Sequence, residues 1–444
     1  MISRDYLKGK RVAIVGLGPH GELVEDVSFF IKAGALVSIY DLKSEARLKQ
    51  HLVFLRTQGL ANYVCGSIPA DDLLDMDLII LSHEYPRESR FLKFVKEKGI
   101  PIEYPETFFF KQAPPVTVVG VMGECGKATV VSMLAPMLAA VCKAGEKQGF
   151  FVIDPDTDEG IISRLKKIKS GDVVLVRIIE PMMRELTAIR ISPHVAVFTT
   201  VPGRGSFDES PFEILSYQTY NNFIVASDEV IDSAGRHKDL PRAKMLRTKT
   251  SIIPEDWDLQ NIAGKSGRIH DRDNAALALQ TARLFKVDDE TARRFLESWK
   301  PLRGRLELVK KVKQVEFYND TASTNPASTL VALQTIVDEK SAILIFGGAQ
   351  TASDYRKLYS ALPKYVHTLI LLPGSGTLRE RPLINGLEEI NIYSVPSIEE
   401  ATRLAFEQAK KGDKVLFSPG FEVAGLDNSR KERGERFVKS VRSL

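Results

Sequence analysis

The sequence predicts an α/β protein made of three consecutive domains. Two observations lead to this prediction: short apolar runs of strand length alternate with helical stretches, and prolines interrupt the alternation at two places. Alternation of this kind is typical of mostly parallel sheets that are covered by helices. The apolar runs lie at residues 12–15, 36–40, 78–81, 116–121, 173–176, 195–198, 343–346 and 369–372.

The two interruptions set the expected domain boundaries. Ala113-Pro114-Pro115 follows the first group of runs, and Trp299-Lys300-Pro301 precedes the last group. A chain of 444 residues also exceeds the roughly 250 to 300 residues at which single cores stop growing. We therefore expect domains at residues 1–112, 113–300 and 301–444.

Composition excludes several classes of protein. The 61 basic and 57 acidic residues leave a net charge of +4, which does not indicate nucleic-acid binding. The three cysteines form no CxxC pair, so neither a disulfide framework nor a zinc site is indicated. No apolar run approaches the roughly 18 residues of a membrane span, and residues 1–10 are too polar for a signal peptide. We expect a cytoplasmic monomer without membrane insertion.

The first apolar run leads into a glycine loop, Gly16-Leu-Gly18-Pro-His-Gly21, and Asp41 ends the next run. This pattern is the dinucleotide-binding fingerprint and predicts a Rossmann-like first domain. A nicotinamide-dependent dehydrogenase is one interpretation, although no residues for hydride chemistry accompany the loop. A uridine nucleotide is another, with Asp41 and Lys43 near its ribose or phosphate.

A second loop, Gly123-Glu-Cys-Gly126-Lys127-Ala-Thr129, lies between an apolar run and a helical stretch. A strand, a glycine turn, a lysine and a helix N-terminus direct backbone N–H groups and positive charge at one point, as polyphosphate requires. We therefore expect a central domain of the P-loop ATPase type. The hydroxyl residue that usually follows the lysine and binds Mg²⁺ is replaced by Ala128.

In order along the chain, these motifs resemble the Mur ligase family, and within it the branch that adds D-glutamate. The match runs nearly end to end and is densest in the Rossmann-like third domain. The motifs there and on the approach to it are His270-Asp-Arg-Asp-Asn274, Leu302-Arg-Gly-Arg-Leu-Glu307, Asn319-Asp-Thr-Ala-Ser-Thr-Asn325, Gly347-Gly348 with Asp354, Ser418-Pro419 and Arg433-Gly434.

The resemblance implies an ATP-dependent amide ligase that works through an acyl phosphate. Its substrates would be a UDP-muramoyl precursor, ATP and D-glutamate, and Mg²⁺ would accompany the ATP. The residues implied for the nucleotide are Gly123, Gly126, Lys127, Thr129, Asn274, Arg305 and Asp320, and Lys127 would also be catalytic. Those implied for the UDP substrate are Gly16, Gly18, Pro19, His20, Asp41, Lys43 and Ser82, and Thr324 would contact the amino acid.

Several positions depart from the family pattern. Arg177 stands where the family has a metal-binding glutamate, and Ala322 and Thr351 stand where it has lysines. Residues 200–205 contain neither the expected Asp nor the expected His. No lysine occurs between Lys169 and Lys238, so the family's modified lysine has no counterpart there. We therefore predict no complete metal site and name Glu180 as a carboxylate that could reach a metal.

Two functions remain open at this stage. The chain could be a D-glutamate-adding ligase in which Glu180 or Glu124 has taken over metal coordination. It could instead be a catalytically impaired homologue that acts as a nucleotide-sugar or partner-binding module, because the charge-bearing positions replaced here are those on which phosphoryl transfer depends.

Overall fold

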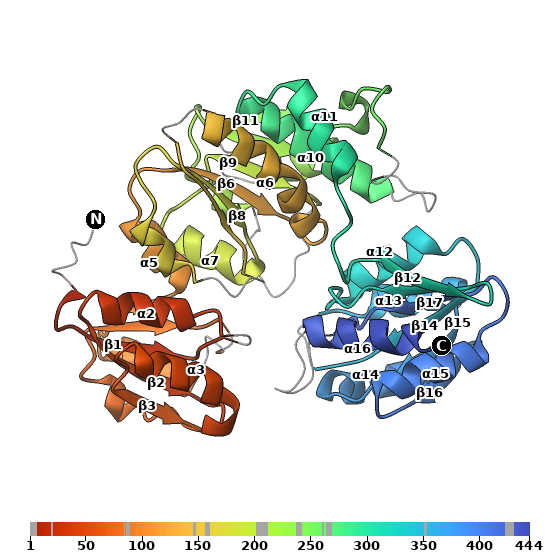
Figure 1. The fold of residues 1–444 in the computed structure, drawn as a ribbon, viewed down its shortest axis with the longest axis horizontal. Coiled ribbons are helices and arrows are strands. Elements are labelled where there is room, and N and C mark those ends of the chain that lie inside the picture. The colour runs from red at the N-terminus through yellow and green to blue at the C-terminus, as the bar shows by residue number, and fades with distance from the viewer. Residues whose placement is uncertain are drawn as a thin grey trace.

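The computed structural model describes residues 7–18, 21–83, 85, 89–144, 148–155, 160–200, 212–236, 242–259, 262, 269–349, 353–421 and 430–444. Figure 1 shows three lobes that follow one another along the chain, each with one sheet and helices on its faces. The α/β class and the order of two Rossmann-like domains around a P-loop domain are confirmed. Each sheet falls inside one of the three expected ranges.

The first sheet has the order β3-β2-β1-β4-β5, and every strand pair in it is parallel. Its elements are β1 (Arg11–Val15), α2 (Val24–Lys32), β2 (Leu36–Asp41), α3 (Glu45–Thr57), β3 (Asn62–Cys65), the 3-10 turn η1 (Asp71–Leu73), β4 (Leu78–Leu81), α4 (Arg90–Glu97) and β5 (Ile102–Glu103). The strand order reverses between β1 and β4. Ligands of such sheets bind beyond the carboxyl ends of the strands at this switch point, where Gly16 and Ser82 lie.

The helix α5 (Pro105–Gln112) joins the first two domains and packs into both. Phe108 belongs to the core of the first domain together with Ile162, which comes from the middle of the chain. The next residue, Phe109, is buried in the core of the central domain. The expected border at residue 112 therefore coincides with the end of a helix that is shared between two cores.

The central sheet has the order β11-β10-β9-β6-β8-β7 and is also parallel. Its elements are β6 (Thr117–Met122), α6 (Lys127–Ala144), β7 (Phe150–Ile153), η2 (Ile162–Lys166), β8 (Val173–Arg177), α7 (Glu180–Ala188), β9 (Val195–Phe198), η3 (Glu213–Leu215), β10 (Phe223–Ala226), α8 (Asp228–Ala234), β11 (Lys244–Arg247), η4 (Thr250–Ile252), α10 (Ile269–Leu284) and α11 (Asp289–Ser298). The strands β7 and β8, which come first in the chain after β6, lie on one side of β6, and β9, β10 and β11 lie on the other side. The loop after β6 thus lies at the switch point of this sheet.

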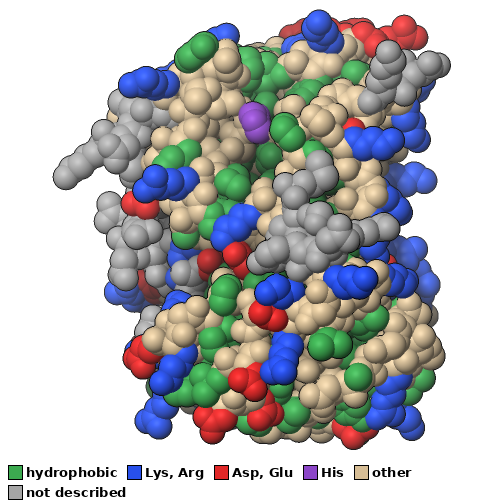
Figure 2. All heavy atoms as spheres, turned by 90° about the vertical axis from the view of Figure 1, so that its left-hand side faces the viewer, with side chains coloured by type: hydrophobic (Ala, Val, Ile, Leu, Met, Phe, Trp, Pro, Cys, Tyr) green, Lys and Arg blue, Asp and Glu red, His purple; other side chains and the backbone are tan. Residues whose placement is uncertain are grey.

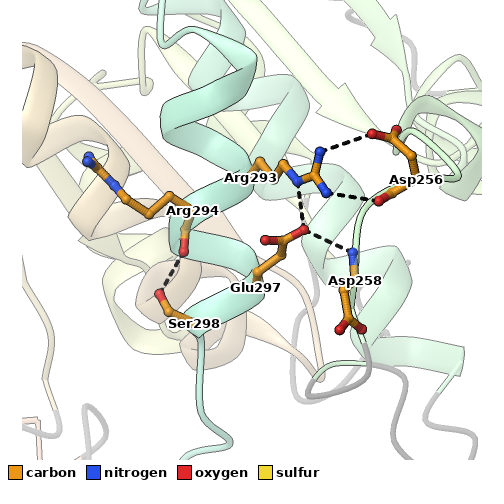
Figure 3. Close-up of polar contacts among 6 residues, drawn as sticks. All are labelled: Asp256, Asp258, Arg293, Arg294, Glu297 and Ser298. Atoms are coloured by element: carbon orange, nitrogen blue, oxygen red, sulfur yellow. Dashed lines mark hydrogen bonds and ion pairs between the residues drawn. The ribbon is translucent and has the colours of Figure 1, made fainter.

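Polar contacts fasten α11 to the segment that precedes α10, as Figure 3 shows. Arg293 donates to the carboxylate and to the carbonyl oxygen of Asp256, both at 3.0 Å. Glu297 accepts from Arg293 at 2.7 Å and from the backbone N–H of Asp258 at 2.9 Å. This network holds the end of the central domain together. Its last residue, Glu297, lies two residues before Trp299, where the link to the third domain begins.

The third sheet has the order β12-β13-β17-β14-β15-β16, in which only the pair β12 and β13 is antiparallel among the pairs described. Its elements are β12 (Glu307–Val312), β13 (Val315–Asn319), α12 (Pro326–Ile336), β14 (Ala342–Phe346), α13 (Arg356–Tyr365), β15 (Val366–Leu371), α14 (Ser375–Asn385), β16 (Asn391–Ser394), α15 (Ile398–Gln408), β17 (Lys414–Phe417) and α16 (Arg430–Arg442). Asp320, Gly347 and Ser418 directly follow β13, β14 and β17. Because these strands are parallel, the three residues lie at one edge of the sheet.

The surface mixes charges of both signs. Figure 2 shows Lys and Arg side chains interspersed with Asp and Glu over the face that it presents. Among the helices in the described ranges, none combines the length and the apolar character needed to cross a bilayer.

Candidate nucleotide-binding site

The loop after β6 requires glycine at two positions. Gly123 and Gly126 have φ angles of +128° and +85°, in the region that favours glycine. A Cβ atom on Gly123 would collide with the hydroxyl of Thr199, and one on Gly126 would lie 2.6 Å from the Oδ1 atom of Asn274. Asn274, on α10, is therefore packed directly against the loop, as expected for a residue of this site.

Backbone N–H groups line the loop. Those of Glu124 and Cys125 donate to the hydroxyl oxygen of Thr200, at 2.9 and 3.4 Å. The N–H groups of the first turn of α6, which begins at Lys127 and includes the buried Thr129, have no partner within the helix. The positive end of the helix dipole lies at the same point, so the geometry suits an anion.

Lys127 folds back over the loop from which it projects. Its Nζ atom donates to the carbonyl oxygen of Gly123 at 2.5 Å and to that of Glu124 at 3.0 Å. Burial is the main cause that lowers the pKa of Lys127 to about 8, and the charges of Arg177 and Arg305 contribute to this lowering. The lysine is thus a cation held in a site that disfavours its own charge, which a phosphate would relieve.

Arg177 is the last residue of β8 and pairs in register with Val121 of β6, next to the loop. Only 5% of the residue is exposed. Its Nε atom donates to Asp154 at 2.6 Å, and Asp154 directly follows β7. The strand ends beside the phosphate loop therefore carry a buried arginine whose position is fixed by an ion pair.

Besides Asp154, the carboxylates of Glu124 and Glu180 lie near the loop. The pKa of Glu124 is raised, chiefly by desolvation and also by the charge of Glu180, while Lys127 and Lys357 lower it. Glu180 opens α7 and lies 3.6 Å from Arg184. Among the residues that the structure describes, no group of three or more His, Cys, Asp or Glu side chains could hold a metal ion. The described side chains thus fit a polyphosphate but do not form a ligand set for Mg²⁺.

Asp320 organises the part of the third domain that carries Arg305. It is 3% exposed, and its carboxylate accepts from the N–H of Leu306 at 3.1 Å and from the hydroxyl of Ser418 at 2.8 Å. Burial raises the pKa of Asp320 to about 6, against the lowering effect of these bonds and of Arg305. Ala322 donates from its backbone N–H to Gly304 at 2.9 Å and holds the same turn. Asp320 therefore positions the turn at residues 304–306, and Arg305 gives this turn a positive charge.

The third domain also contacts the phosphate loop through α12. Asn325 caps this helix by accepting from the N–H of Ser328 at 2.8 Å, and the Ser328 hydroxyl lies 3.4 Å from the Sγ atom of Cys125. Thr324 immediately precedes the cap and is partly buried. The residue expected to contact the amino acid thus lies beside the helix end that touches the loop.

The first-domain residues gather around the other glycine loop. Asp41 accepts from the N–H of Leu17 at 2.9 Å, and Lys43 donates to the carbonyl oxygen of Gly18 at 3.0 Å. Gly16 and Gly18 have φ angles of +80° and +86°. Ser82 follows β4, and its N–H donates to the carbonyl oxygen of Val15 at 2.9 Å. Five of the seven residues expected to bind the UDP substrate therefore share one edge of the sheet.

Some expectations fall outside the described residues. Pro19, His20 and Thr351 are among them, as is the segment 201–205. Sequence reasoning also missed several residues that the structure brings to the site. One is Thr200, whose hydroxyl accepts from the backbone of the phosphate loop. Another is Asp154, which follows β7 and pairs with Arg177 at the end of β8. No local pattern connects those two residues, which are 23 positions apart.

Comparison with known proteins finds similarity to Mur ligases. Residues 304–421 match the family model described as "Mur ligase, glutamate ligase domain". The UDP-N-acetylmuramoylalanine–D-glutamate ligase of Clostridioides difficile strain 630 is 25% identical over 463 residues, with 99% of each chain covered. The ligase of the same name from Borreliella burgdorferi strain B31 is 26% identical over 466 residues, again with 99% of each chain covered.

Solved structures share the fold at lower identity. A murein peptide ligase from Psychrobacter arcticus has a TM-score of 0.56 and 14% identity, with 98% of this chain and 99% of that chain covered. The UDP-N-acetylmuramate–alanine ligase of Thermotoga maritima has a TM-score of 0.56 and 16% identity, with the same coverage. The sequence matches confirm the resemblance to the Mur ligase family that the motifs predicted, and the solved structures show that the fold is shared.

Proposed function

We propose that this protein is an ATP-dependent ligase of peptidoglycan precursor synthesis, which joins D-glutamate to UDP-N-acetylmuramoyl-L-alanine. One observation carries the proposal. A phosphate loop with Lys127 lies at the switch point of the central sheet, within electrostatic range of Arg305 from the third domain. It does so in a chain similar over 99% of its length to ligases named for this reaction.

The reaction has two steps. The carboxylate of the UDP-muramoyl precursor attacks the γ-phosphate of ATP, which releases ADP and leaves an acyl phosphate. The amine of D-glutamate then attacks the acyl carbon, phosphate departs, and the amide forms with loss of the amine proton. Both steps gather negative charge, and positioning together with electrostatic stabilisation supplies most of the catalysis of such transfers.

The cations that this chain offers for that charge are Lys127, Arg177 and Arg305. Lys127 would bind the phosphate oxygens after turning away from the loop carbonyls that it now contacts. The first-domain loop around Gly16 would take the UDP part, and the α12 end around Thr324 would take D-glutamate. We assign no step to Mg²⁺, because the described carboxylates do not form a ligand set for it.

Phosphate release tests the proposal. Purified protein with ATP, Mg²⁺, UDP-N-acetylmuramoyl-L-alanine and D-glutamate should release phosphate only when all components are present. Replacing D-glutamate by L-glutamate should stop it, and Lys127→Ala should slow it about 100-fold or more, as the loss of one charge-stabilising group does. Absence of phosphate release from folded protein with the complete mixture would reject the ligase.

The second candidate is an impaired homologue that binds a nucleotide sugar or a protein partner without turnover. The replacements favour it: Ala128 follows the loop lysine, Arg177 ends β8, and Ala322 lies in the turn beside Asp320. This candidate predicts that ATP and the UDP precursor bind to the protein while no phosphate appears. Binding together with phosphate release would exclude it.

A further inference from the structure

Three cations approach the phosphate loop from three separate elements. Lys127 belongs to α6, Arg177 to β8, and Arg305 to the turn before β12 of the third domain. Burial is the main cause of the lowered pKa of Lys127, and Arg177 and Arg305 are the next charges that lower it. The charges of both arginines therefore act on the ammonium group of Lys127.

Arg177 is built into the site. It is 5% exposed, it pairs in register with Val121 near the end of β6, and its Nε atom donates to Asp154 at 2.6 Å. A guanidinium group is planar and always charged, and its fork of N–H donors matches the oxygens of a phosphate. The ion pair with Asp154 fixes this group beside the loop in advance of any ligand, which lowers the entropy cost of binding one.

The same neighbourhood suits a divalent cation poorly. Phosphate loops usually provide a Ser or Thr hydroxyl for Mg²⁺ directly after the lysine, and Ala128 has none. Among the described residues, the carboxylates of Asp154, Glu180 and Glu124 lie near the loop, but Asp154 pairs with Arg177 and Glu180 with Arg184. The carboxyl group of Glu124 interacts with Lys127 and Lys357. A metal ion at the strand ends would also face the positive charge of Arg177.

We propose that this site binds the polyphosphate of a nucleotide without a divalent metal ion, and that the Arg177 guanidinium takes the charge-neutralising place of the metal. The inference rests on the proposed function, because it concerns the same loop. Its ligand class is a nucleoside di- or triphosphate in the metal-free form.

Calorimetric titration with ATP tests the inference, once in EDTA and once in excess Mg²⁺. We expect ATP to bind in EDTA with an affinity equal to or higher than in Mg²⁺. Arg177→Gln should weaken binding in EDTA about tenfold to a hundredfold, the range for one charge-assisted hydrogen bond. Glu124→Gln should strengthen it, because a carboxylate beside the phosphates is removed.

Two controls separate binding from folding. Asp154→Asn combined with Arg177→Gln removes both members of the ion pair, so no unpaired buried charge is left, and it should show the same loss of affinity. Arg247→Gln removes an exposed arginine, paired with Asp228 and Asp232 at the far edge of the same sheet, and should bind ATP normally. Thermal unfolding of each variant verifies that it folds.

The outcomes distinguish this inference from the proposed function. Binding that requires Mg²⁺, or equal binding in EDTA by wild-type protein and Arg177→Gln, would overturn the inference and leave the ligase untouched. A loss of Mg²⁺-dependent binding in a Glu124→Gln, Glu180→Gln double variant would overturn it in the same way. Failure of ATP to bind under either condition would remove the proposed function and the inference together.

Discussion

The ammonium group of Lys127 lies 2.5 Å from the carbonyl oxygen of Gly123. The lysine therefore occupies its own loop and has to leave this carbonyl oxygen before it can bind a ligand. The same contact explains why an ammonium group can stay in a site that lowers its pKa: two carbonyl dipoles, those of Gly123 and Glu124, compensate part of the lost hydration. A polyphosphate would replace these weak acceptors by charged ones.

Nucleotide affinity should depend on pH through Lys127. Its pKa is about 8 in the free protein, and a bound phosphate favours the charged form, so binding raises the pKa and takes up a proton above pH 8. Affinity should therefore fall as the pH rises above about 8. Calorimetry at alkaline pH in two buffers of different ionisation enthalpy measures the proton uptake, and equal heats in both buffers would contradict the assignment.

Gly126→Ala should weaken ATP binding, because it adds a steric clash to the backbone strain of an alanine at positive φ. The new Cβ would lie 2.6 Å from Asn274 Oδ1 and force this buried amide away from the loop. Gly171→Ala is the matched control, because Gly171 has a similar φ of +89° and open space around a Cβ, so only the conformational cost of about 1 to 2 kcal/mol applies. We expect both variants to lose stability in chemical denaturation and only Gly126→Ala to lose ATP binding. Normal ATP binding by Gly126→Ala would contradict the packing of Asn274 on the loop.

The first two domains meet at a buried carboxylate whose charge is unfavourable. Asp26 on α2 accepts from the N–H of Ser163 in η2 at 2.8 Å, and burial raises its pKa from 3.8 to about 7. The folded protein then binds more protons than the unfolded chain between these values, so this group's contribution to stability is full below about pH 4 and is lost by about pH 7. The difference corresponds to about 4 kcal/mol.

Asp26→Asn should remove that pH dependence. The amide oxygen can still accept from Ser163, and no charge is buried, so we expect the variant to be at least as stable as wild type at pH 8 and to lose the decline between about pH 4 and pH 7. Urea unfolding across this range measures the effect. A variant that is less stable than wild type at pH 8 would show that the ionised carboxylate stabilises the domain contact.

Arg293→Ala should loosen the segment that precedes α10. The guanidinium binds both the carboxylate and the backbone carbonyl of Asp256, as Figure 3 shows, whereas the neighbouring Arg294 points away from that segment. Hydrogen exchange of residues 256–258 should quicken in Arg293→Ala and stay unchanged in Arg294→Ala. Equal exchange in the two variants would mean that the backbone alone fixes this segment.

The fold could be predicted from sequence because its signals are local. The apolar runs correctly located strands in each of the three sheets, although they missed others such as β13 and β17, and each glycine loop directly follows the strand that positions it. The expected boundary at residue 112 does not separate the two cores, because α5 packs Phe108 into the first core and Phe109 into the second. Adjacent residues that serve different domains leave no compositional break.

The site could be predicted only in part, because its remaining contacts join distant segments. Lys127, Asn274 and Arg305 came from motifs. The structure packs Asn274 against the loop that leads into Lys127, and the charge of Arg305 lowers the pKa of Lys127. The pairing of Arg177 with Asp154 depends on the order of β7 and β8 in the sheet, and the contact of Cys125 with Ser328 depends on how two domains meet. Neither contact can be predicted from a short segment of sequence, because the partners are 23 and 203 positions apart.

Titration of ATP into wild-type protein, Lys127→Ala and Lys143→Ala tests the central claim most directly. Lys143 lies in the last turn of the same helix and is exposed, so it controls for the loss of a positive charge from α6. We expect one ATP site in wild type and in Lys143→Ala, and binding at least about tenfold weaker in Lys127→Ala. Equal affinity in all three proteins, or no binding in any of them, would contradict this claim.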